Sequence, residues 1–255
     1  MSVALHHRVD GPDDAPPLLL GNSLGTALAM WNGVVAQLDG AVRAVRFDLR
    51  GQGASPAPAG PYELADLGGD VLALMDRLGL ERASYCGVSI GGMVGLWLAA
   101  HAPERVDRLV VCCSSAHLPD HAAWAERAAT VRAAGGTAPI ADVVVSRWLT
   151  PVFAAEHPKI MDMLRSMLLA SPAEGYAACC GVLEHLDLRD DLGAIRAPAL
   201  VVGGAGDEAI PPDHARAIAD GIPGARFVRM DPAAHIPMAE RPGAVADLIR
   251  EHLEA

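Results

Sequence analysis

The chain has 255 residues, of which 51% are hydrophobic and 20% charged, and its formal net charge is −11. This composition supplies a large apolar core and excludes a disordered chain, and the length suits a single α/β domain. The negative charge argues against nucleic acids and anionic membrane surfaces as partners, because no basic stripe is present to release counterions.

The sequence contains no recognisable targeting or membrane-spanning segment. Met1–His7 has no basic stretch followed by an apolar one, so we expect no signal peptide. No apolar run approaches the roughly 18 residues of a spanning helix, and we expect a cytoplasmic protein. The five cysteines include two adjacent pairs and no C-x-x-C spacing, which predicts buried free thiols and neither disulfides nor a zinc site.

Predicted strands and helices alternate along the first half of the chain. Short apolar runs predict strands, and apolar residues at helical spacing predict helices. In chain order we expect strands at 3–9, 17–20 and 41–47, a helix at 64–78, a strand at 82–86, a helix at 91–101 and a strand at 108–113.

The alternation resumes near the C-terminus, with strands at 198–203 and 226–230 and helices at 212–220 and 242–253. The interval 118–191 has several helical patterns and no convincing strand. We therefore predict an α/β-hydrolase type of fold, in which helices flank a mostly parallel sheet. Its core domain comprises 1–117 and 192–255, and 118–191 form a helical cap (lid) over the strand ends, where open α/β sheets keep their sites.

A G-x-S-x-G motif, Gly87–Gly91, joins a predicted strand to a predicted helix. A corner this tight forces its central residue into strained backbone geometry and lifts the Ser89 side chain clear of the sheet. Glycines are needed on both sides because a Cβ would collide with the neighbouring strand or helix. At the helix N-terminus, free amides and the positive end of the dipole favour a developing oxyanion. The motif predicts that Ser89 is a nucleophile.

A nucleophilic serine needs a base, and the base needs an acid that orients it. Asp207 and His235 each follow one of the last two predicted strands, so their side chains are expected at the carboxyl edge of the sheet. The chain order Ser89, Asp207, His235 is that of the α/β hydrolases.

Other residues compete for these roles. Asp207 could instead cap the helix that opens near Pro211, and Glu208 or Asp231 could then be the acid. His117 follows a predicted strand and could line the pocket. The other histidines are expected at the surface: His6, His7, His101, His121, His157, His185, His214 and His252.

Two backbone amides are expected to hold the oxyanion. One belongs to Ile90, directly after the nucleophile, and the other to Leu24, in the turn after the second predicted strand. Many hydrolases of this fold have His-Gly before the second donor, and Asn22 replaces that His here. The segment 48–55 matches the D-x-R-G-x-G-x-S turn of the fold, which braces the oxyanion loop, so Arg50 is predicted to be structural.

With these residues placed, the chain resembles the 3-oxoadipate enol-lactonases of bacterial aromatic degradation over nearly its whole length. Cap motifs separate subfamilies, so they weigh more than the triad. The segments that carry the resemblance are Gly21–Thr26 with Met30-Trp31, Cys86–Met93, Arg147–Pro151, Gly175–Cys180 and Asp187–Asp190. Two features depart from the family. The N-terminus looks short, so the family's first strand is expected to be absent, and Ile236-Pro237-Met238 replaces Leu-Ser-Asn after His235.

The resemblance implies hydrolysis of an enol-lactone through an acyl-serine. Ser89 would attack the carbonyl, His235 would take its proton, and the two amides would hold the oxyanion. No cofactor or metal is implied. The implied partner is a small anionic lactone, with no nucleic acid or membrane, and the sequence is compatible with a homo-oligomer.

The carboxylate on the side arm of this substrate requires a local cation, because the net charge of −11 repels it. Arg147 is the first candidate, with the adjacent Trp148 as an apolar wall for the ring. Asn22 and Ser23 are also assigned to substrate binding. The alternative is that Arg147 only pairs with an acid of the cap such as Asp142.

Other functions fit the same residues. A general carboxylesterase, or a C–C bond hydrolase acting on ring-cleavage products, would use the same triad and a similar cap. A low-turnover ligand-binding protein of this fold would keep the pocket. The cap motifs favour the lactonase, and the complete set of serine, acid and histidine argues against the binding protein.

Overall fold

Seven strands form one sheet in the order β1-β3-β2-β4-β5-β6-β7 in the computed structural model, which describes residues 2–255. β1 pairs with β3 in antiparallel fashion, and the other neighbouring pairs are parallel. This mostly parallel sheet confirms the predicted fold class. The strands are β1 (His7–Asp10), β2 (Pro17–Gly21), β3 (Arg43–Phe47), β4 (Ala83–Val88), β5 (Val106–Cys112), β6 (Ala199–Gly204) and β7 (Arg226–Met230).

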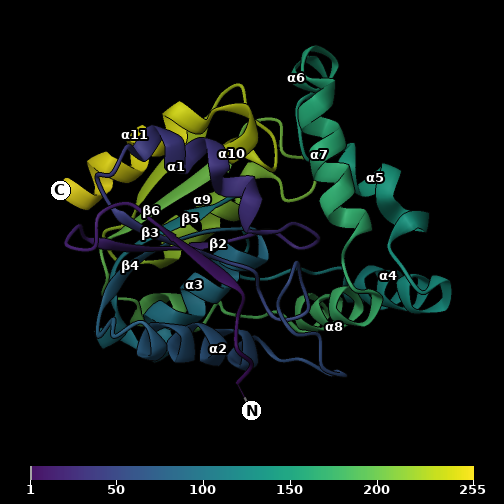
Figure 1. Ribbon diagram of the computed structural model, residues 1–255, viewed down its shortest axis with the longest axis horizontal. Coiled ribbons are helices and arrows are strands. Elements are labelled where there is room, and N and C mark those ends of the chain that lie inside the picture. Colours follow the sequence, from purple (N-terminus) through teal and green to yellow (C-terminus); the bar gives the residue numbers. More distant parts are fainter. Residues whose placement is uncertain (1) are drawn as a thin grey trace.

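Helices cover both faces of this sheet (Figure 1). α1 and α11 pack together on one face, α2 and α3 lie on the other, and α9 packs against β6 and β7. These helices, with the short α10, are α1 (Asn32–Leu38), α2 (Leu64–Arg77), α3 (Ile90–His101), α9 (Pro212–Gly221), α10 (Pro237–Glu240) and α11 (Pro242–Glu254).

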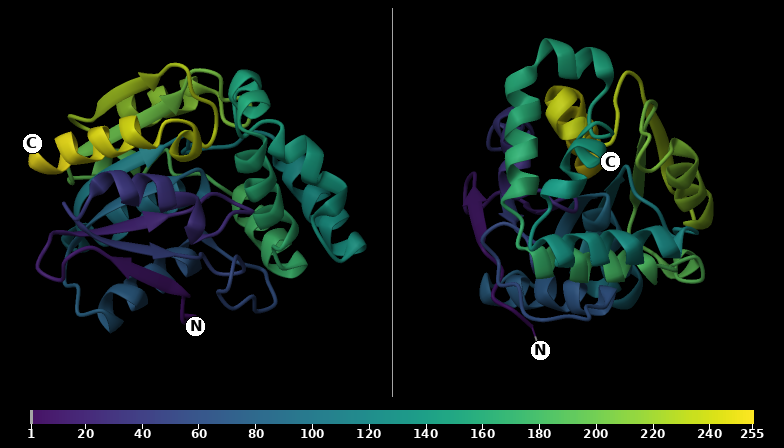
Figure 2. Two further views of the ribbon diagram at one scale, coloured as in Figure 1. Left: turned by 45° about the horizontal axis from the view of Figure 1, so that its top comes forward. Right: turned by 90° about the vertical axis from the view of Figure 1, so that its right-hand side faces the viewer.

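Between β5 and β6 the chain leaves the sheet and forms five helices that stand beside the strand ends (Figure 2). They are α4 (His121–Ala134), α5 (Ala141–Val145), α6 (Pro151–Glu156), α7 (Pro158–Leu169) and α8 (Ala173–Glu184). We call α4–α8 the cap. In the described residues this interval contains an isolated β-bridge, His117 to Asp187, and no strand. The domain boundaries near 118 and 191 stay a prediction.

Several strand boundaries differ from the predictions by one to four residues, and β3, for example, begins at Arg43 and not at residue 41. β1 begins at His7 and not at residue 3, because the amides of Val3 and His6 donate to side chains, at 2.7 Å to Asp70 Oδ1 and at 2.9 Å to Ser55 Oγ. β5 begins two residues earlier than predicted, with Val106 paired to β4.

Helix α1 is not predicted by apolar periodicity. Only Val34 and Leu38 of its seven residues are buried, and Gly33 lowers its helical propensity. The helix is stabilised by packing against α11, which local sequence patterns do not report.

All five cysteines are buried and unpaired, as predicted. Among residues 2–255, no helix combines the length and apolar character needed to cross a bilayer.

Candidate active site

The corner around Ser89 has the backbone geometry that its motif predicts. Ser89 lies between β4 and α3 with φ 56° and ψ −124°, a conformation that L-residues rarely adopt. A Cβ on Gly87 would overlap the carbonyl group of Gly91, and one on Gly91 would lie 2.5 Å from the carbonyl oxygen of Gly21. The corner therefore needs glycine on both sides of Ser89, and it presents the hydroxyl at the start of α3.

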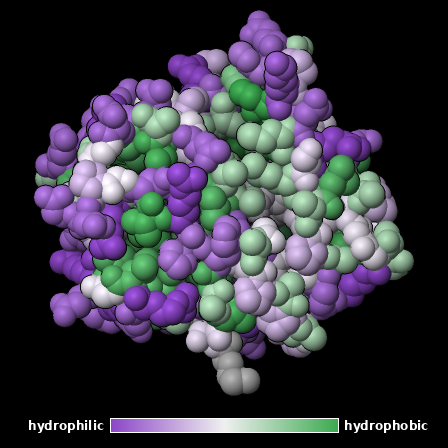
Figure 3. Space-filling view, viewed as in Figure 1, coloured by the Kyte–Doolittle hydropathy of each residue, from purple (hydrophilic) through white to green (hydrophobic). Residues whose placement is uncertain are grey.

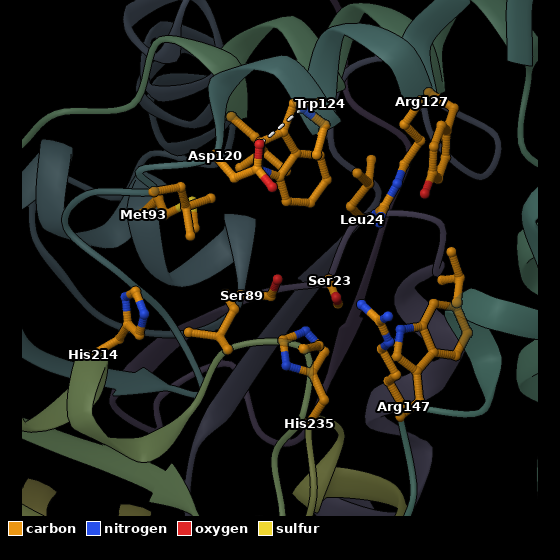
Figure 4. A pocket seen from close by; sticks show the side chains of 18 of the residues that line it. Ser23, Leu24, Ser89, Met93, Asp120, Trp124, Arg127, Arg147, His214 and His235 are labelled. Atoms are coloured by element: carbon orange, nitrogen blue, oxygen red, sulfur yellow. Dashed lines mark hydrogen bonds between the residues drawn. The ribbon is translucent and has the colours of Figure 1, made fainter. Parts of the chain in front are cut away.

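Asp207 and His235 are buried neighbours at the ends of β6 and β7. His235 Nδ1 lies 2.9 Å from Asp207 Oδ2. The other carboxylate oxygen, Oδ1, accepts hydrogen bonds from the amides of Ala209 at 2.8 Å and Ile210 at 2.9 Å. These bonds fix the carboxylate against the imidazole, and Figure 4 shows the ring of His235 beside Ser89. The structure thus brings together the three side chains predicted to act as nucleophile, base and acid.

The competing acids lie elsewhere. Glu208 is exposed. The side chain of Asp231 is 67% exposed and lies 3.7 Å from Arg229. The N-cap of α9 is Pro211 and receives no side-chain hydrogen bond, so Asp207 does not cap that helix.

Three other histidines lie at informative positions. His117 bonds through Nδ1 to the carbonyl of Leu186 at 3.2 Å and does not line the cavity described below. His214 does line that cavity, half-buried and with Nδ1 2.8 Å from Ser115 Oγ, a role that the sequence analysis did not assign to it.

The surface prediction was wrong for His252, which is buried on α11. It lies three residues after Ile249 and seven after Val245, which puts it on the buried face of the helix. Its Nε2 lies 3.1 Å from the carbonyl oxygen of Pro198.

The two predicted oxyanion donors have no acceptor within residues 2–255. The amide of Ile90 opens α3, where no helical carbonyl is in reach, and the amide of Leu24 donates no hydrogen bond. The loop around Leu24 is held by its neighbours. Asn22 Nδ2 donates to the carbonyl of Thr26 at 2.8 Å, and the amide of Gly25 donates to Gln52 Oε1 at 2.7 Å. Both amides are thus available to a ligand.

The segment 48–55 braces this loop, and Arg50 is structural, as predicted. Asp48 Oδ1 accepts a hydrogen bond from the amide of Leu28 at 2.6 Å. The buried guanidinium of Arg50 donates to both carboxylate oxygens of Asp70, at 2.7 and 2.9 Å, and these bonds raise the pKa of Arg50. Arg50 does not line the cavity.

A cavity of about 230 Å³ lies between the strand ends and the cap (Figure 4). Ser89 and His235 line it, and three predicted substrate-binding residues line it with them: Ser23, Arg147 and Trp148. Asn22 does not. Its side chain is fully buried and closes the loop onto Thr26, so the prediction that Asn22 contacts substrate receives no support from its position.

Two arginines line this cavity, Arg147 and the unpredicted Arg127. Within residues 2–255, the Arg147 guanidinium makes no ion pair or side-chain hydrogen bond, and Asp142 pairs instead with Arg165 at 3.0 Å. The guanidinium carbon of Arg127 lies 4.5 Å from the centre of the Trp124 ring. Figure 4 shows both guanidinium groups on the side of the pocket opposite His214.

Arg127 could have been found from its spacing. It follows Trp124 by three residues on α4, and side chains three apart share a helix face. A cation on the same face as an aromatic ring, in a helix expected to cover the strand ends, is a candidate pocket residue.

The arrangement suits acyl transfer from an ester. It combines a serine at a helix N-terminus, a histidine oriented by a carboxylate, and two amides without acceptors. In the part of the chain that the structure describes, no cluster of three or more His, Cys, Asp or Glu residues could hold a metal ion.

Comparison with known proteins extends the likeness over sheet and cap. A model of the α/β hydrolase fold family matches residues 16–138. The 3-oxoadipate enol-lactonase 2 of Acinetobacter baylyi is 39% identical over 242 residues, which cover 95% of this chain and 90% of that protein. The crystal structure of the enol-lactonase from Burkholderia xenovorans is 40% identical, with a TM-score of 0.96 over 99% of this chain and 97% of that one.

A more distant relative is a thermophilic esterase from Thermogutta terrifontis, whose structure has malate bound. It is 30% identical, with a TM-score of 0.93 over 99% of this chain and 93% of that one. Esterases and enol-lactonases thus share this arrangement of sheet and cap.

Proposed function

The chain belongs to the 3-oxoadipate enol-lactonases of the α/β-hydrolase fold and is a carboxylic-ester hydrolase, and on this premise we propose that it hydrolyses 3-oxoadipate enol-lactone to 3-oxoadipate. The observation that carries the proposal is a single cavity lined by Ser89, His235 and two arginines. A role in bacterial aromatic-compound degradation, through the β-ketoadipate pathway, is part of the same proposal.

In the proposed acylation step, Ser89 Oγ attacks the lactone carbonyl while His235 Nε2 takes its proton. Asp207, bonded to Nδ1, keeps the imidazole oriented and stabilises its positive charge. The amides of Leu24 and Ile90 donate to the oxyanion. The bond between the carbonyl carbon and the ring oxygen then breaks, and this oxygen takes the proton from His235 and becomes an enol that stays on the acyl chain of the acyl-serine.

The leaving group makes this step favourable, because an enolate is a far weaker base than an alkoxide. The enol tautomerises to the ketone, which draws the reaction to completion. His235 then takes a proton from water, the hydroxide attacks the acyl-serine, and the free acid leaves as Ser89 recovers its proton.

We assign recognition of the side-arm carboxylate to Arg147, with Trp148 as an apolar wall. Arg147 is suited to this role because no acid within residues 2–255 neutralises its guanidinium. Arg127 lines the same cavity and adds positive charge there. A small carboxylate, malate, is bound in the structure of the Thermogutta relative, which supports an anion as ligand.

The test is to supply the purified protein with enol-lactone, prepared enzymatically from muconolactone, and follow the loss of its ultraviolet absorbance. We expect rapid loss that Ser89→Ala abolishes. Hydrolysis of neutral aryl esters without acceleration of enol-lactone opening would instead identify a general carboxylesterase, the alternative that the Thermogutta relative represents.

A further inference from the structure

A buried glutamate, Glu240, connects the cap to the loop that carries His235. It lies at the end of α10 and is 7% exposed. Its carboxylate accepts hydrogen bonds from the backbone amide of Thr150 and, at 3.4 Å, from the Thr150 hydroxyl. The backbone amide of Ala234, directly before His235, also stabilises the charge of this carboxylate. This side chain belongs to α10, which begins two residues after His235, so its bonds to Thr150 join two segments that are far apart in the sequence.

Further contacts join the same two segments. The amide of Ile236, directly after His235, donates to the carbonyl of Trp148 at 2.9 Å. Thr150 also approaches the loop that carries the acid, since a methyl group added to Gly206 would lie 3.6 Å from the Thr150 methyl. The stretch 147–150 thus contacts the loops of the base and the acid, and it contributes Arg147 and Trp148 to the cavity wall.

The chemistry at Glu240 fits a side chain that connects two segments better than one that only fills space in the core. Burial raises the pKa of the Glu240 carboxyl, and the hydrogen bonds from Thr150, together with the nearby backbone amide of Ala234, oppose that rise by stabilising its charge. An apolar side chain would fill this space without the cost of desolvating a carboxylate. It could not accept the two hydrogen bonds from Thr150.

We propose that Glu240 is a positioning residue that holds the cap segment 147–150 in register with the His235 loop. Glu240 does not line the cavity, so it acts through Arg147, Trp148 and His235. The proposal rests on the proposed function in so far as those residues act on the enol-lactone. A misplacement of about 1 Å away from the reacting atoms can reduce a rate by about 100-fold.

The first test measures hydrogen exchange and needs no activity. In Glu240→Gln, the amides of Thr150 and Ile236 should exchange about 10-fold faster or more than in the wild type. The control Glu156→Gln makes the same chemical change at an exposed position on α6, a cap helix, and should leave both amides unchanged. Wild-type protection of both amides in Glu240→Gln would overturn the proposal.

The second test measures kinetics per active site, titrated with an irreversible serine reagent. Glu240→Gln should lower kcat/KM for the enol-lactone by on the order of 10- to 100-fold, without reducing the number of titrated sites. Thr150→Val, which removes only the hydroxyl bond, should cause a smaller loss. If instead the variant had fewer titrated sites but each site turned over at the wild-type rate, Glu240 would serve stability alone, which would contradict the proposal.

A double-mutant cycle with Arg147→Met gives the sharpest kinetic result. If Glu240 places Arg147, its substitution should cost much less in the Arg147→Met background than in the wild type. Independent, multiplicative losses would contradict placement of Arg147. If the wild type does not open enol-lactone at all, the proposed function fails. The role of Glu240 is then decided by amide hydrogen exchange and by the turnover of aryl esters, which do not depend on that function.

Discussion

Functional side chains are held differently by the sheet and by the cap. At the strand ends, Asp207 bonds His235 and two backbone amides, and Gln52 holds the oxyanion loop. In the cap, the cavity-lining Arg147 has no ion-pair partner within residues 2–255. Large apolar side chains are also exposed there, namely Val143, Val152, Met163 and Leu169. Figure 3 shows green, apolar surface among purple, polar surface on that side of the molecule.

The difference separates two tasks. Groups at the strand ends are fixed before a substrate arrives, as the chemistry of ester hydrolysis requires. In the cap, Arg147 carries a charge that no acid within residues 2–255 pairs with, so this charge is available to a ligand. We therefore expect substitutions near the sheet to change turnover of every ester, and substitutions in the cap to change the choice of ester.

The largest effect is expected at the nucleophile. Ser89→Ala should lower kcat by about 10⁶-fold on any ester, and Asp207→Asn by about 10⁴-fold, because the latter leaves nucleophile and base in place. Steady-state or single-turnover assays on the purified, folded variants would measure both losses in kcat. Full activity of Asp207→Asn, with loss on changing Glu208 or Asp231, would refute the assignment of the acid.

The same type of substitution, glycine to alanine, should have opposite effects on the free energy of unfolding in the sheet and in the cap. Gly87→Ala places a methyl group against the Gly91 carbonyl and should lower the free energy of unfolding by about 3 kcal/mol or more. Gly181→Ala, within α8 and with no atom within 4 Å of the new methyl, should raise it by about 0.5–1 kcal/mol. Urea unfolding measures both, and similar shifts would mean that the corner is less constrained than its geometry indicates.

A smaller effect is expected from His252, on the sheet side of the molecule. Burial lowers the pKa of His252 from 6.5, so the unfolded chain binds more protons than the folded one below that pH. The stabilising contribution of the neutral side chain is complete above pH 6.5 and is lost as the pH falls through the folded pKa. Unfolding of His252→Gln should therefore depend less on pH between 7 and about 5 than unfolding of the wild type. Parallel pH profiles would exclude this role.

The strand-end residues were predictable because local patterns determine them. Ser89 follows β4 directly, and Asp207 and His235 lie in the loops after β6 and β7. The carboxyl ends of parallel strands meet at one edge of a sheet. Buried apolar runs mark such strands in the sequence, so the candidate triad follows from the order of elements.

The cap residues were harder to predict because their positions depend on packing between distant segments. Thr150 and Glu240 are 90 residues apart in the sequence, and no periodic pattern pairs them. Arg127 reaches the cavity only because α4 packs along α8 beside the strand ends. Arg147 was predicted through a family resemblance and Arg127 was missed, although both line the same cavity.

The most direct test of the division between sheet and cap is the effect of Arg147→Met on two substrates in one preparation. A hydrogen bond to a charged group is worth about 1.5–3 kcal/mol, so kcat/KM for the anionic enol-lactone should fall by roughly 10- to 150-fold. Hydrolysis of a neutral aryl ester should change by less than about twofold, since that ester lacks the carboxylate.

Arg165→Met is the matched control, because Arg165 is a cap arginine that pairs with Asp142 and does not line the cavity. It should change neither rate. Inactive protein in the sample lowers both rates by the same factor, so it does not affect the ratio of the two kcat/KM losses in Arg147→Met. A large ratio is the predicted result, and equal losses on both substrates would contradict the assignment of substrate recognition to the cap.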